Sequence, residues 1–263
     1  MAFSILLLSH VMNDFLLQQR FLVSAKKQKS KTLFFQPAIL VHAICLFILS
    51  ILIAVAESAM SWRFLLADLL VVICHYFIDY WKNLQKSKPL KVFLLDQLFH
   101  ILSLALVCML LGYIKFPLNF EKSIVMIKAH DLKLNHFSQL NLLGTWLVSL
   151  LWGIAYFVQS ILQDKEDIWP GEGETYRETL KMREEGHRFE RHIGYMERIL
   201  ILLFTLHQAY GAIVLLFIGK ALVCRNKLKD PLYQDFFLYT TLLSFTGALI
   251  FSSLYRYFFF LVI

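Results

Sequence analysis

Apolar runs long enough to cross a bilayer are the feature that most limits how this chain can fold. Residues 37–56 contain no Asp, Glu, Lys or Arg, and a helix of about 20 residues spans the hydrocarbon core of a membrane. Hydrophobic residues make up 58% of the 263 positions, more than soluble domains usually carry. The runs are continuous rather than alternating as in barrel strands. Because helices satisfy their own backbone polar groups in lipid, we predict an all-α, polytopic transmembrane helical bundle.

The apolar runs divide the chain into about seven or eight hydrophobic segments. We expect helices over residues 2–19, 37–56, 63–82, 91–114 and 140–163, another apolar region over 194–224, and a last helix over 232–262. The resulting organisation is a four-helix part (1–114), an external loop (115–139), a transmembrane helix (140–163), a charged cytoplasmic segment (164–193) and C-terminal hydrophobic helices (194–263).

Lysine and arginine in the short loops indicate how the helices are oriented. The loops after the first and third predicted helices are basic, whereas the loop between the second and third holds only Arg63 against Glu57. Cytoplasmic loops carry the excess of Lys and Arg. We therefore expect a multi-pass protein of the bacterial inner (cytoplasmic) membrane with its N-terminus outside. The net charge of +7 is then a property of loops, and no nucleic-acid partner is expected. The basic residues are Arg20, Lys26, Lys27, Lys29 and Lys31 in one loop and Lys82, Lys86, Lys88 and Lys91 in the other.

The apolar region 194–224 fits poorly as a single crossing. One tilted helix would put Arg225, Lys227 and Lys229 outside, against the charge rule. The sequence HQAYG at 207–211 offers a break, and two half-helices that both return to the cytoplasm would restore the rule. Irregular backbone at that depth is tolerated only within protein or beside a wet cavity. We predict a broken, re-entrant helix here, with the single tilted helix as the alternative.

Histidine and aspartate recur together inside the first four predicted helices. His10 precedes Asp14 in the first helix and His75 precedes Asp79 in the third. The i,i+4 spacing puts both members of each pair on one helix face. A charged group in hydrocarbon is costly and normally faces a partner. These pairs therefore predict a polar site between helices.

The direction of each helix predicts that these side chains share one depth. The first helix runs inward and the fourth runs outward, so Asp96 lies level with Asp14 and His100 lies level with His10. His42 lies near the start of the second helix, at its inner end. We expect one layer beneath the cytoplasmic surface to contain His10, Asp14, His42, His75, Asp79, Asp96 and His100.

The first four helices also contain two stretches of similar sequence. HVMNDFLLQ at 10–18 resembles HYFIDYWKN at 75–83. A basic loop follows each stretch, and then a helix with a histidine near its start, at His42 and His100. This pattern indicates a tandem repeat of a helix pair.

Three interpretations of the polar layer compete. Imidazole and carboxylate are ligands for Zn²⁺, Mn²⁺ or Fe²⁺, and the set could hold one ion or two. Chains of His and Asp also serve as proton or ion paths, and interhelical hydrogen bonds need involve no chemistry. We favour a divalent metal centre. Asp14, Asp79 and Asp96 are the candidate catalytic carboxylates, one of them free as general base, and Gln18 and Gln97 are expected to orient the ligands.

The same motifs carry a family resemblance. HVMNDFLLQ, HAI, HYFIDYWK and LLDQLFH look like motifs of the bacterial DUF3307 membrane proteins. HIGYMERILI, GAIVLLFIGKALVCR and TLLSFTGALI are similar to the C-terminal pattern of that group. The resemblance implies a polytopic inner-membrane protein and brings no activity with it. The paired HxxxD pattern also resembles predicted membrane-bound metal-dependent hydrolases, which would imply hydrolysis.

The charged segment 164–193 is the long soluble stretch that this topology places in the cytoplasm. From Thr175 to Arg191 it has helical composition and opposite charges at i,i+4 spacing. It is either a solvated helix or a lid or docking element above the polar layer. A cytoplasmic protein is the partner that such an element would recruit.

A few polar residues in the C-terminal half are weaker candidates. Glu197 and Arg198 could pair with each other or with the polar layer, and His207 falls at the predicted break. The side chains of Lys220 and Arg256 are expected to extend along apolar surface so that their charged ends reach the membrane–water interface.

The function most consistent with these features is metal-dependent hydrolysis of a lipid-like or phosphoester substrate, with membrane lipid as the partner. A metal-ion or proton transporter is one alternative. It needs a polar route outward, and the outer halves of the second and fourth helices are almost entirely apolar. A membrane scaffold that recruits a cytoplasmic partner through 164–193 is the other.

Overall fold

The computed structural model describes residues 1–17, 36–85, 88–114, 136–164, 192–225, 227–229 and 231–258. Every regular element within these ranges is a helix, which confirms the all-α prediction. Five helices are long and apolar enough to cross a membrane, and two shorter apolar helices accompany them. The five are Pro37–Ala56, Trp62–Leu84, Pro89–Leu110, His136–Leu162 and Phe237–Tyr257, and the shorter two are Ala2–Leu16 and Tyr210–Val223.

The chain divides into two compact units, Met1–Ser149 and Leu150–Ile263. The first unit contains α1 (Ala2–Val11), the π-helical turn η1 (Met12–Leu16), α3 (Pro37–Ala56), α4 (Trp62–Leu84), α5 (Pro89–Leu110) and α7 (His136–Val148). The starts of these helices follow ordinary rules. Proline opens α3 and α5, where its missing N–H costs nothing. The Ser61 side chain caps α4 by accepting a hydrogen bond from the Phe64 N–H at 3.1 Å.

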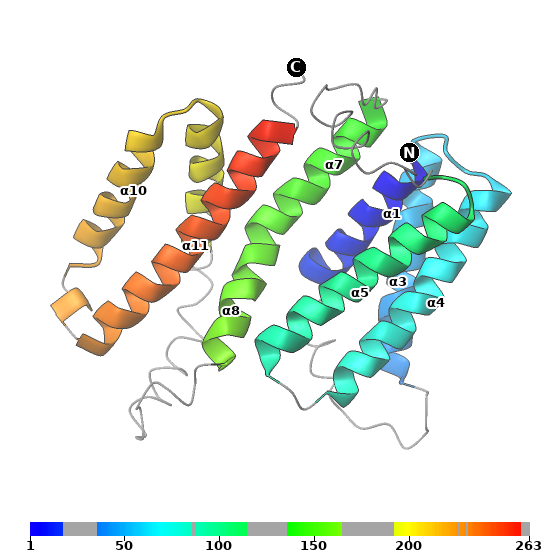
Figure 1. Cartoon of the computed structure of the whole chain (residues 1–263), viewed down its shortest axis with the longest axis horizontal. Coiled ribbons are helices and arrows are strands. Elements are labelled where there is room, and N and C mark those ends of the chain that lie inside the picture. Colours follow the sequence, from blue (N-terminus) through cyan, green and yellow to red (C-terminus); the bar gives the residue numbers. More distant parts are fainter. Residues whose placement is uncertain are drawn as a thin grey trace, which may run out of the picture. The chain divides into compact units, whose positions relative to one another are not determined.

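Four helices of the first unit form a ring. Helix α1 packs against α3 and α5, and α4 packs against the same two neighbours (Figure 1). Helix α7 packs against α1 from outside the ring. Consecutive ring helices run in opposite directions, so one end of the ring collects the start of α1, the end of α3, the start of α4 and the end of α5.

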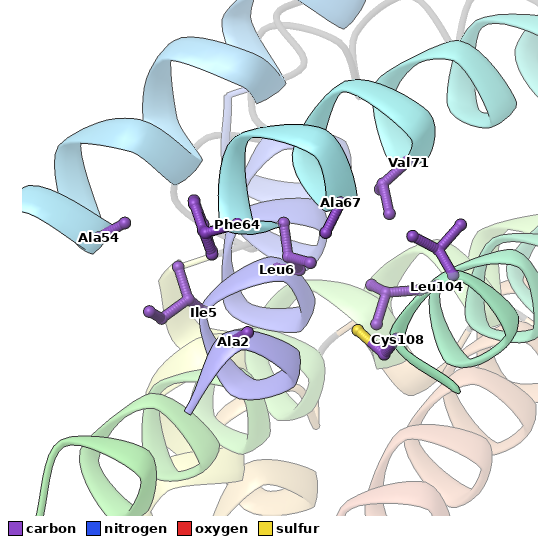
Figure 2. Packing of buried hydrophobic residues seen from close by; sticks show 10 residues of the cluster. Ala2, Ile5, Leu6, Ala54, Phe64, Ala67, Val71, Leu104 and Cys108 are labelled. Atoms are coloured by element: carbon purple, nitrogen blue, oxygen red, sulfur yellow. The ribbon is translucent and has the colours of Figure 1, made fainter. Parts of the chain in front are cut away.

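That end of the ring is apolar. Ile5 and Leu6 of α1 lie beside Phe64 of α4, with Leu104 and Cys108 of α5 close by (Figure 2). These side chains are buried, with Ile5 at 0% and Leu6 at 1% exposure. The His and Asp residues lie toward the opposite end of each helix. The apolar packing and the polar side chains therefore occupy different ends of the ring.

Two helix ends differ from the prediction. The fourth predicted helix was drawn to residue 114, but α5 ends at Leu110 because the chain turns at Gly112, where φ is 74°. Glycine adopts this left-handed conformation without steric cost. The fifth helix was predicted to begin at residue 140, but α7 already includes His136.

The second unit contains the predicted break. Residues 192–206 are helical, residues 207–209 turn, and α10 (Tyr210–Val223) follows. Gln208 has a φ of 57°. Lys220 in the second arm donates to the Glu197 carboxylate in the first arm at 2.8 Å, so the two arms lie antiparallel. The broken helix near 207–211 is therefore confirmed, and the return of both arms to the cytoplasm stays a prediction. The second arm, α10, has 14 residues and is about 21 Å long, shorter than the ~30 Å hydrocarbon core.

The remaining elements of the second unit are α8 (Ile154–Asp164), the short η3 (Lys227–Lys229) and α11 (Pro231–Phe258). Helix α8 packs against α11. A second apolar core holds Ile154 and Val158 of α8, Ile201 of the first arm, and Phe245 and Ala248 of α11.

Candidate metal centre

The end of α1 departs from α-helical geometry where the site begins. Its α-helical hydrogen bonding stops at Val11 and continues as the π-helical turn Met12–Leu16, with the Leu17 N–H donating to the Met12 carbonyl at 2.9 Å. Such single π-turns occur often at functional sites. Here the turn contains Asp14, which is buried inside the ring with 5% exposure.

The Asp14 carboxylate is surrounded by three histidines from three helices. His42 Nε2 lies 3.1 Å from Asp14 Oδ1, and His75 Nε2 lies 3.5 Å from the same oxygen. His10 Nε2 is 3.8 Å from Asp14 Oδ2. Imidazole nitrogens from α1, α3 and α4 therefore meet at one carboxylate.

The Asp79 carboxylate lies in a similar arrangement. Its Oδ1 is 3.9 Å from His100 Nε2. Its Oδ2 is 3.7 Å from His42 Nε2 and 3.9 Å from His75 Nε2. Asp96 joins this group through Oδ1, which is 3.4 Å from His100 Nε2.

The structure thus brings all seven predicted side chains together. Each is at most 5% exposed, and they come from α1, η1, α3, α4 and α5. The predicted alignment of depths agrees with the contacts, because the His10 and His100 rings lie 4.6 Å apart. We call these side chains the His/Asp cluster: His10, Asp14, His42, His75, Asp79, Asp96 and His100.

Several cluster atoms lack the hydrogen bonds that burial normally requires. His10 Nε2, His75 Nε2, His100 Nε2 and Asp96 Oδ1 are buried and find no hydrogen-bond partner among the described residues. An unsatisfied buried polar atom costs about 1–3 kcal/mol. A cation among these lone pairs would remove that cost.

The distances between the ligand atoms would suit a bound metal ion if these atoms moved slightly closer together. Ligand atoms lie within 4.8 Å of one another in each of three overlapping groups. Ligands at about 2.0–2.1 Å around a tetrahedral ion are roughly 3.4 Å apart. Imidazole and carboxylate together suit Zn²⁺, Mn²⁺ and Fe²⁺. The three groups are His10/His75/His100, Asp14/His42/His75 and Asp14/Asp96/His100.

Two residues that were not among the predicted site residues touch the cluster. Asn13 Nδ2 lies 3.1 Å from His42 Nε2 and donates to the His42 carbonyl at 3.3 Å. Lys82 was assigned to a basic loop, which is wrong: it lies in the last turn of α4, and its Nζ is 2.6 Å from Asp96 Oδ2. Its spacing from Asp79 was the available signal, since residues three apart share a helix face.

The two glutamines proposed to orient the ligands have different outcomes. Gln97 donates through Nε2 to Asp96 Oδ2 at 3.1 Å, so it contacts a cluster carboxylate. Gln18 lies outside the described residues, as do residues 115–135 and 165–191, which include most of the external loop and of the charged segment.

A further buried carboxylate was also missed. Asp68 of α4 is 0% exposed and accepts a hydrogen bond from the Ser50 hydroxyl of α3 at 2.6 Å. Its Oδ1 has no hydrogen-bond partner among the described residues. Seven residues separate Asp68 from His75, so it lies about 10 Å from the cluster along the helix axis.

The weaker C-terminal candidates make local contacts within the second unit. Arg198 donates to the Ser244 hydroxyl at 3.1 Å and to the Leu151 carbonyl, which lies in the π-helical turn η2 (Ser149–Gly153). A π-turn shifts the helical register and frees a carbonyl for such a donor.

Three other polar residues of this unit have the following surroundings. The Lys220 ammonium pairs with the Glu197 carboxylate, which is buried and needs a counter-charge. His207 is exposed in the turn. Arg256 donates to the exposed Tyr210 hydroxyl at 3.1 Å.

Together these observations define a helical membrane protein with a buried His/Asp cluster that could hold a metal. Residues 2–127, just under half of the chain, match the model of a family described as "Protein of unknown function (DUF3307)", so this region is similar to that family. The matched region contains the whole His/Asp cluster and ends before the C-terminal motifs. Comparisons with curated proteins and with solved structures found no match. The likeness to metal-dependent hydrolases stays a prediction.

Proposed function

We propose that this protein is a divalent-metal-dependent hydrolase that acts on a lipid-like substrate, a phosphoester or an amide, inside the membrane. The observation that carries the proposal is the convergence of buried atoms that have no hydrogen-bond partner among the described residues. They are the Nε2 atoms of three histidines, which we take as ligands, and Oδ1 of Asp96, which we take as the base. Hydrogen-bonded structural histidines would not leave these atoms unsatisfied. The donor set suits Zn²⁺, Mn²⁺ or Fe²⁺.

Within this proposal the cluster residues divide into ligands and one base. A divalent ion would supply Lewis acidity and lower the pKa of a coordinated water to about 7. Asp96 is our choice for the general base. Lys82 and Gln97 hold its Oδ2, while its Oδ1 faces His100 and remains able to accept a proton.

The membrane position of the cluster supports a lipid-like substrate. The ring helices α3, α4 and α5 are each long and apolar enough to cross a bilayer, and the cluster lies between them near one end. The basic stretches that follow α1 and α4 in the sequence adjoin that same end. By the charge rule, we place the cluster near the cytoplasmic leaflet of the bacterial inner membrane, with the N-terminus outside.

Metal analysis of detergent-purified protein tests the proposal directly. We expect bound Zn, Mn or Fe in the wild type and loss of that metal in the double variant Asp14→Ala/His75→Ala. Asp68→Asn is the matched control, because it also changes a buried carboxylate of the first unit but lies outside the cluster. Absence of metal from the wild type after reconstitution with each ion would overturn the proposal.

Hydrolysis is tested separately from metal binding. Phosphatidylglycerol vesicles are incubated with the protein with and without EDTA, and mass spectrometry follows the cleavage products. We expect turnover that EDTA removes and that Mn²⁺ or Zn²⁺ restores. Asp96→Asn should abolish turnover while retaining metal. An Asp96→Asn variant with wild-type turnover would exclude Asp96 as the base.

One observation favours movement of protons or metal ions as a second candidate function. The buried Asp68–Ser50 pair places a carboxylate about 10 Å from the cluster toward the apolar end of the ring. The sequences of α3 and α5 alone indicate no polar route there. In proteoliposomes with an internal pH dye or a Mn²⁺-sensitive dye, a transporter would show flux that Asp68→Asn abolishes. A hydrolase would show no flux.

A further inference from the structure

The ring of helices has an approximate twofold relation. Exchanging α1 with α4, and α3 with α5, preserves the packing, because α1 and α4 each contact both α3 and α5. The two similar sequence stretches follow the same exchange, because HVMNDFLLQ lies at the end of the α1 region and HYFIDYWKN lies at the end of α4. Under this exchange His10 corresponds to His75, Asp14 to Asp79, and His42 to His100.

Side-chain geometry follows the same exchange. The His42 and His75 rings lie 5.2 Å apart with an interplanar angle of 40°. Their counterparts, His100 and His10, lie 4.6 Å apart at 42°. His42 approaches Asp14 at 3.1 Å, and His100 approaches Asp79 at 3.9 Å. One ring pair and one His–Asp pair in each half therefore have counterparts in the other half.

Interatomic distances define a three-residue ligand set in one half, and the exchange predicts a second set in the other half. The donor atoms of Asp14, His42 and His75 all lie within 4.8 Å of one another. The exchange turns this set into Asp79, His100 and His10. In that second set His100 Nε2 lies 3.9 Å from Asp79 Oδ1. The ligand atoms of His100 and His10 lie within 4.8 Å of each other. Two histidines and one carboxylate form a familiar ligand set for a divalent ion with open positions.

From this geometry we infer that the His/Asp cluster holds two divalent metal ions, one in each ligand set. The inference rests on the proposed metal-dependent function and deepens it. Each ion takes an aspartate and a histidine from one helix pair and a histidine from the other, so neither helix pair alone completes a site.

The residues without counterparts distinguish the two halves. Asp96 corresponds to Ala38, and Lys82 corresponds to Leu17. The Lys82–Asp96 pair is thus an addition to one half, beyond the two ligand sets. This asymmetry leaves Asp96 as the carboxylate free to accept a proton, in agreement with the role proposed above.

Charge favours a phosphoester as the substrate of a two-ion centre. Three ionised aspartates beside Lys82 carry two net negative charges, which a single divalent ion would neutralise. Two ions leave two positive charges in excess, which an anionic phosphoester would offset. Two-metal sites with ions about 3.5–4 Å apart stabilise both the attacking and the leaving oxygen of a phosphoryl group. An amide would bring no such charge.

Metal stoichiometry of the full-length protein in detergent tests the inference. We expect two Mn²⁺ per chain after reconstitution with Mn²⁺ alone, with the paramagnetic resonance spectrum of a spin-coupled pair. One Mn²⁺ per chain, or two with uncoupled spectra, would overturn the two-ion inference and leave the proposed metal site standing. No bound ion would overturn both.

Matched variants test the division into two sets. His42→Ala and His100→Ala occupy corresponding positions, and each should retain about one Mn²⁺ per chain and lose the coupled signal. Loss of both ions from each variant, with circular dichroism unchanged, would contradict two separate ligand sets. Asn141→Ala, a buried change on α7 away from the cluster, should keep both ions.

Discussion

The Nζ atom of Lys82 lies 2.6 Å from Oδ2 of Asp96, and this pair joins the last turn of α4 to the start of α5 beside the His/Asp cluster. The Asp96 side chain is 0% exposed and that of Lys82 is 32% exposed. A buried carboxylate is thus neutralised by a lysine that partly reaches solvent.

Removal of the lysine charge should destabilise the fold. Breaking a fully buried ion pair costs about 3–5 kcal/mol, and because water reaches Lys82 we expect about 1–3 kcal/mol for Lys82→Met in metal-free protein. Thermal unfolding in detergent measures this change. Lys91→Met, an exposed change on α5, should leave the midpoint unaltered. Equal midpoints for both variants would show that the pair contributes nothing.

Asn13→Ala should weaken metal binding. Its amide contacts both the ring and the carbonyl of His42, and residues that orient a ligand typically affect metal affinity about 10–100-fold. Competition with a chelating dye measures the affinity. Asn141→Ala removes a buried amide that bonds Ser4 instead and should leave affinity unchanged. A result in which both variants match the wild type would remove Asn13 from the site.

Ser50→Ala should destabilise the apolar half of the ring. Asp68 accepts the Ser50 hydrogen bond while 0% exposed, and an unsatisfied buried acceptor costs about 1–3 kcal/mol. Chemical or thermal unfolding reports the loss. Ser160→Ala is the control, because the Ser160 hydroxyl donates to the Phe157 carbonyl within its own helix turn. We expect the control to change stability by less than Ser50→Ala, and the reverse order would contradict the prediction.

Leu6→Ala should cost stability without affecting metal content. Leu6 is 1% exposed in the apolar cluster. Buried Leu→Ala changes cost about 2–5 kcal/mol in soluble cores. We expect about 2 kcal/mol here, because lipid already shelters apolar side chains and only packing is lost. Leu52→Ala, at a position 60% exposed on α3, should be nearly neutral. Metal loss in Leu6→Ala would show that the two ends of the ring depend on each other.

Reporter fusions test the proposed topology. Alkaline phosphatase is active only outside the cytoplasm, so a fusion after Met60, beyond the end of α3, should be active. A fusion after Arg225 should be inactive if both arms of the broken helix return to the cytoplasm. Activity at both points would favour the single tilted crossing.

The fold class could be predicted because it depends on local properties. The run of apolar residues that became α3 was predicted with its final bounds, Pro37–Ala56, since composition and proline alone determine them. The break near 207–211 also followed from local signals, the HQAYG stretch and the basic residues after it. By contrast, the fifth helix was predicted to begin at residue 140, although α7 already includes residues 136–139, because this mixed stretch of His, Phe, Ser and Gln gives no clear helix signal.

The membership of the His/Asp cluster could also be predicted, because i,i+4 spacing and helix direction determine the face and the depth of a side chain. Which atoms meet across the ring could not, since that depends on the rotation of each helix about its axis. Asn13 and Lys82 were therefore not predicted to contact the cluster. Asp68 was not predicted to have a role, because it is a single acidic residue in an apolar run.

The sequence by itself determined that this chain is a bundle of membrane-crossing helices with histidine and aspartate gathered at one depth, because apolar length, residue spacing and loop charge are properties of neighbouring residues. Only the tertiary structure decided which groups meet: the π-turn that contains Asp14, the lysine that pairs with Asp96, the serine that donates to Asp68, and the histidines that surround Asp14 and Asp79. The physical reason is that these relations are set by packing between helices, which no stretch of sequence contains alone.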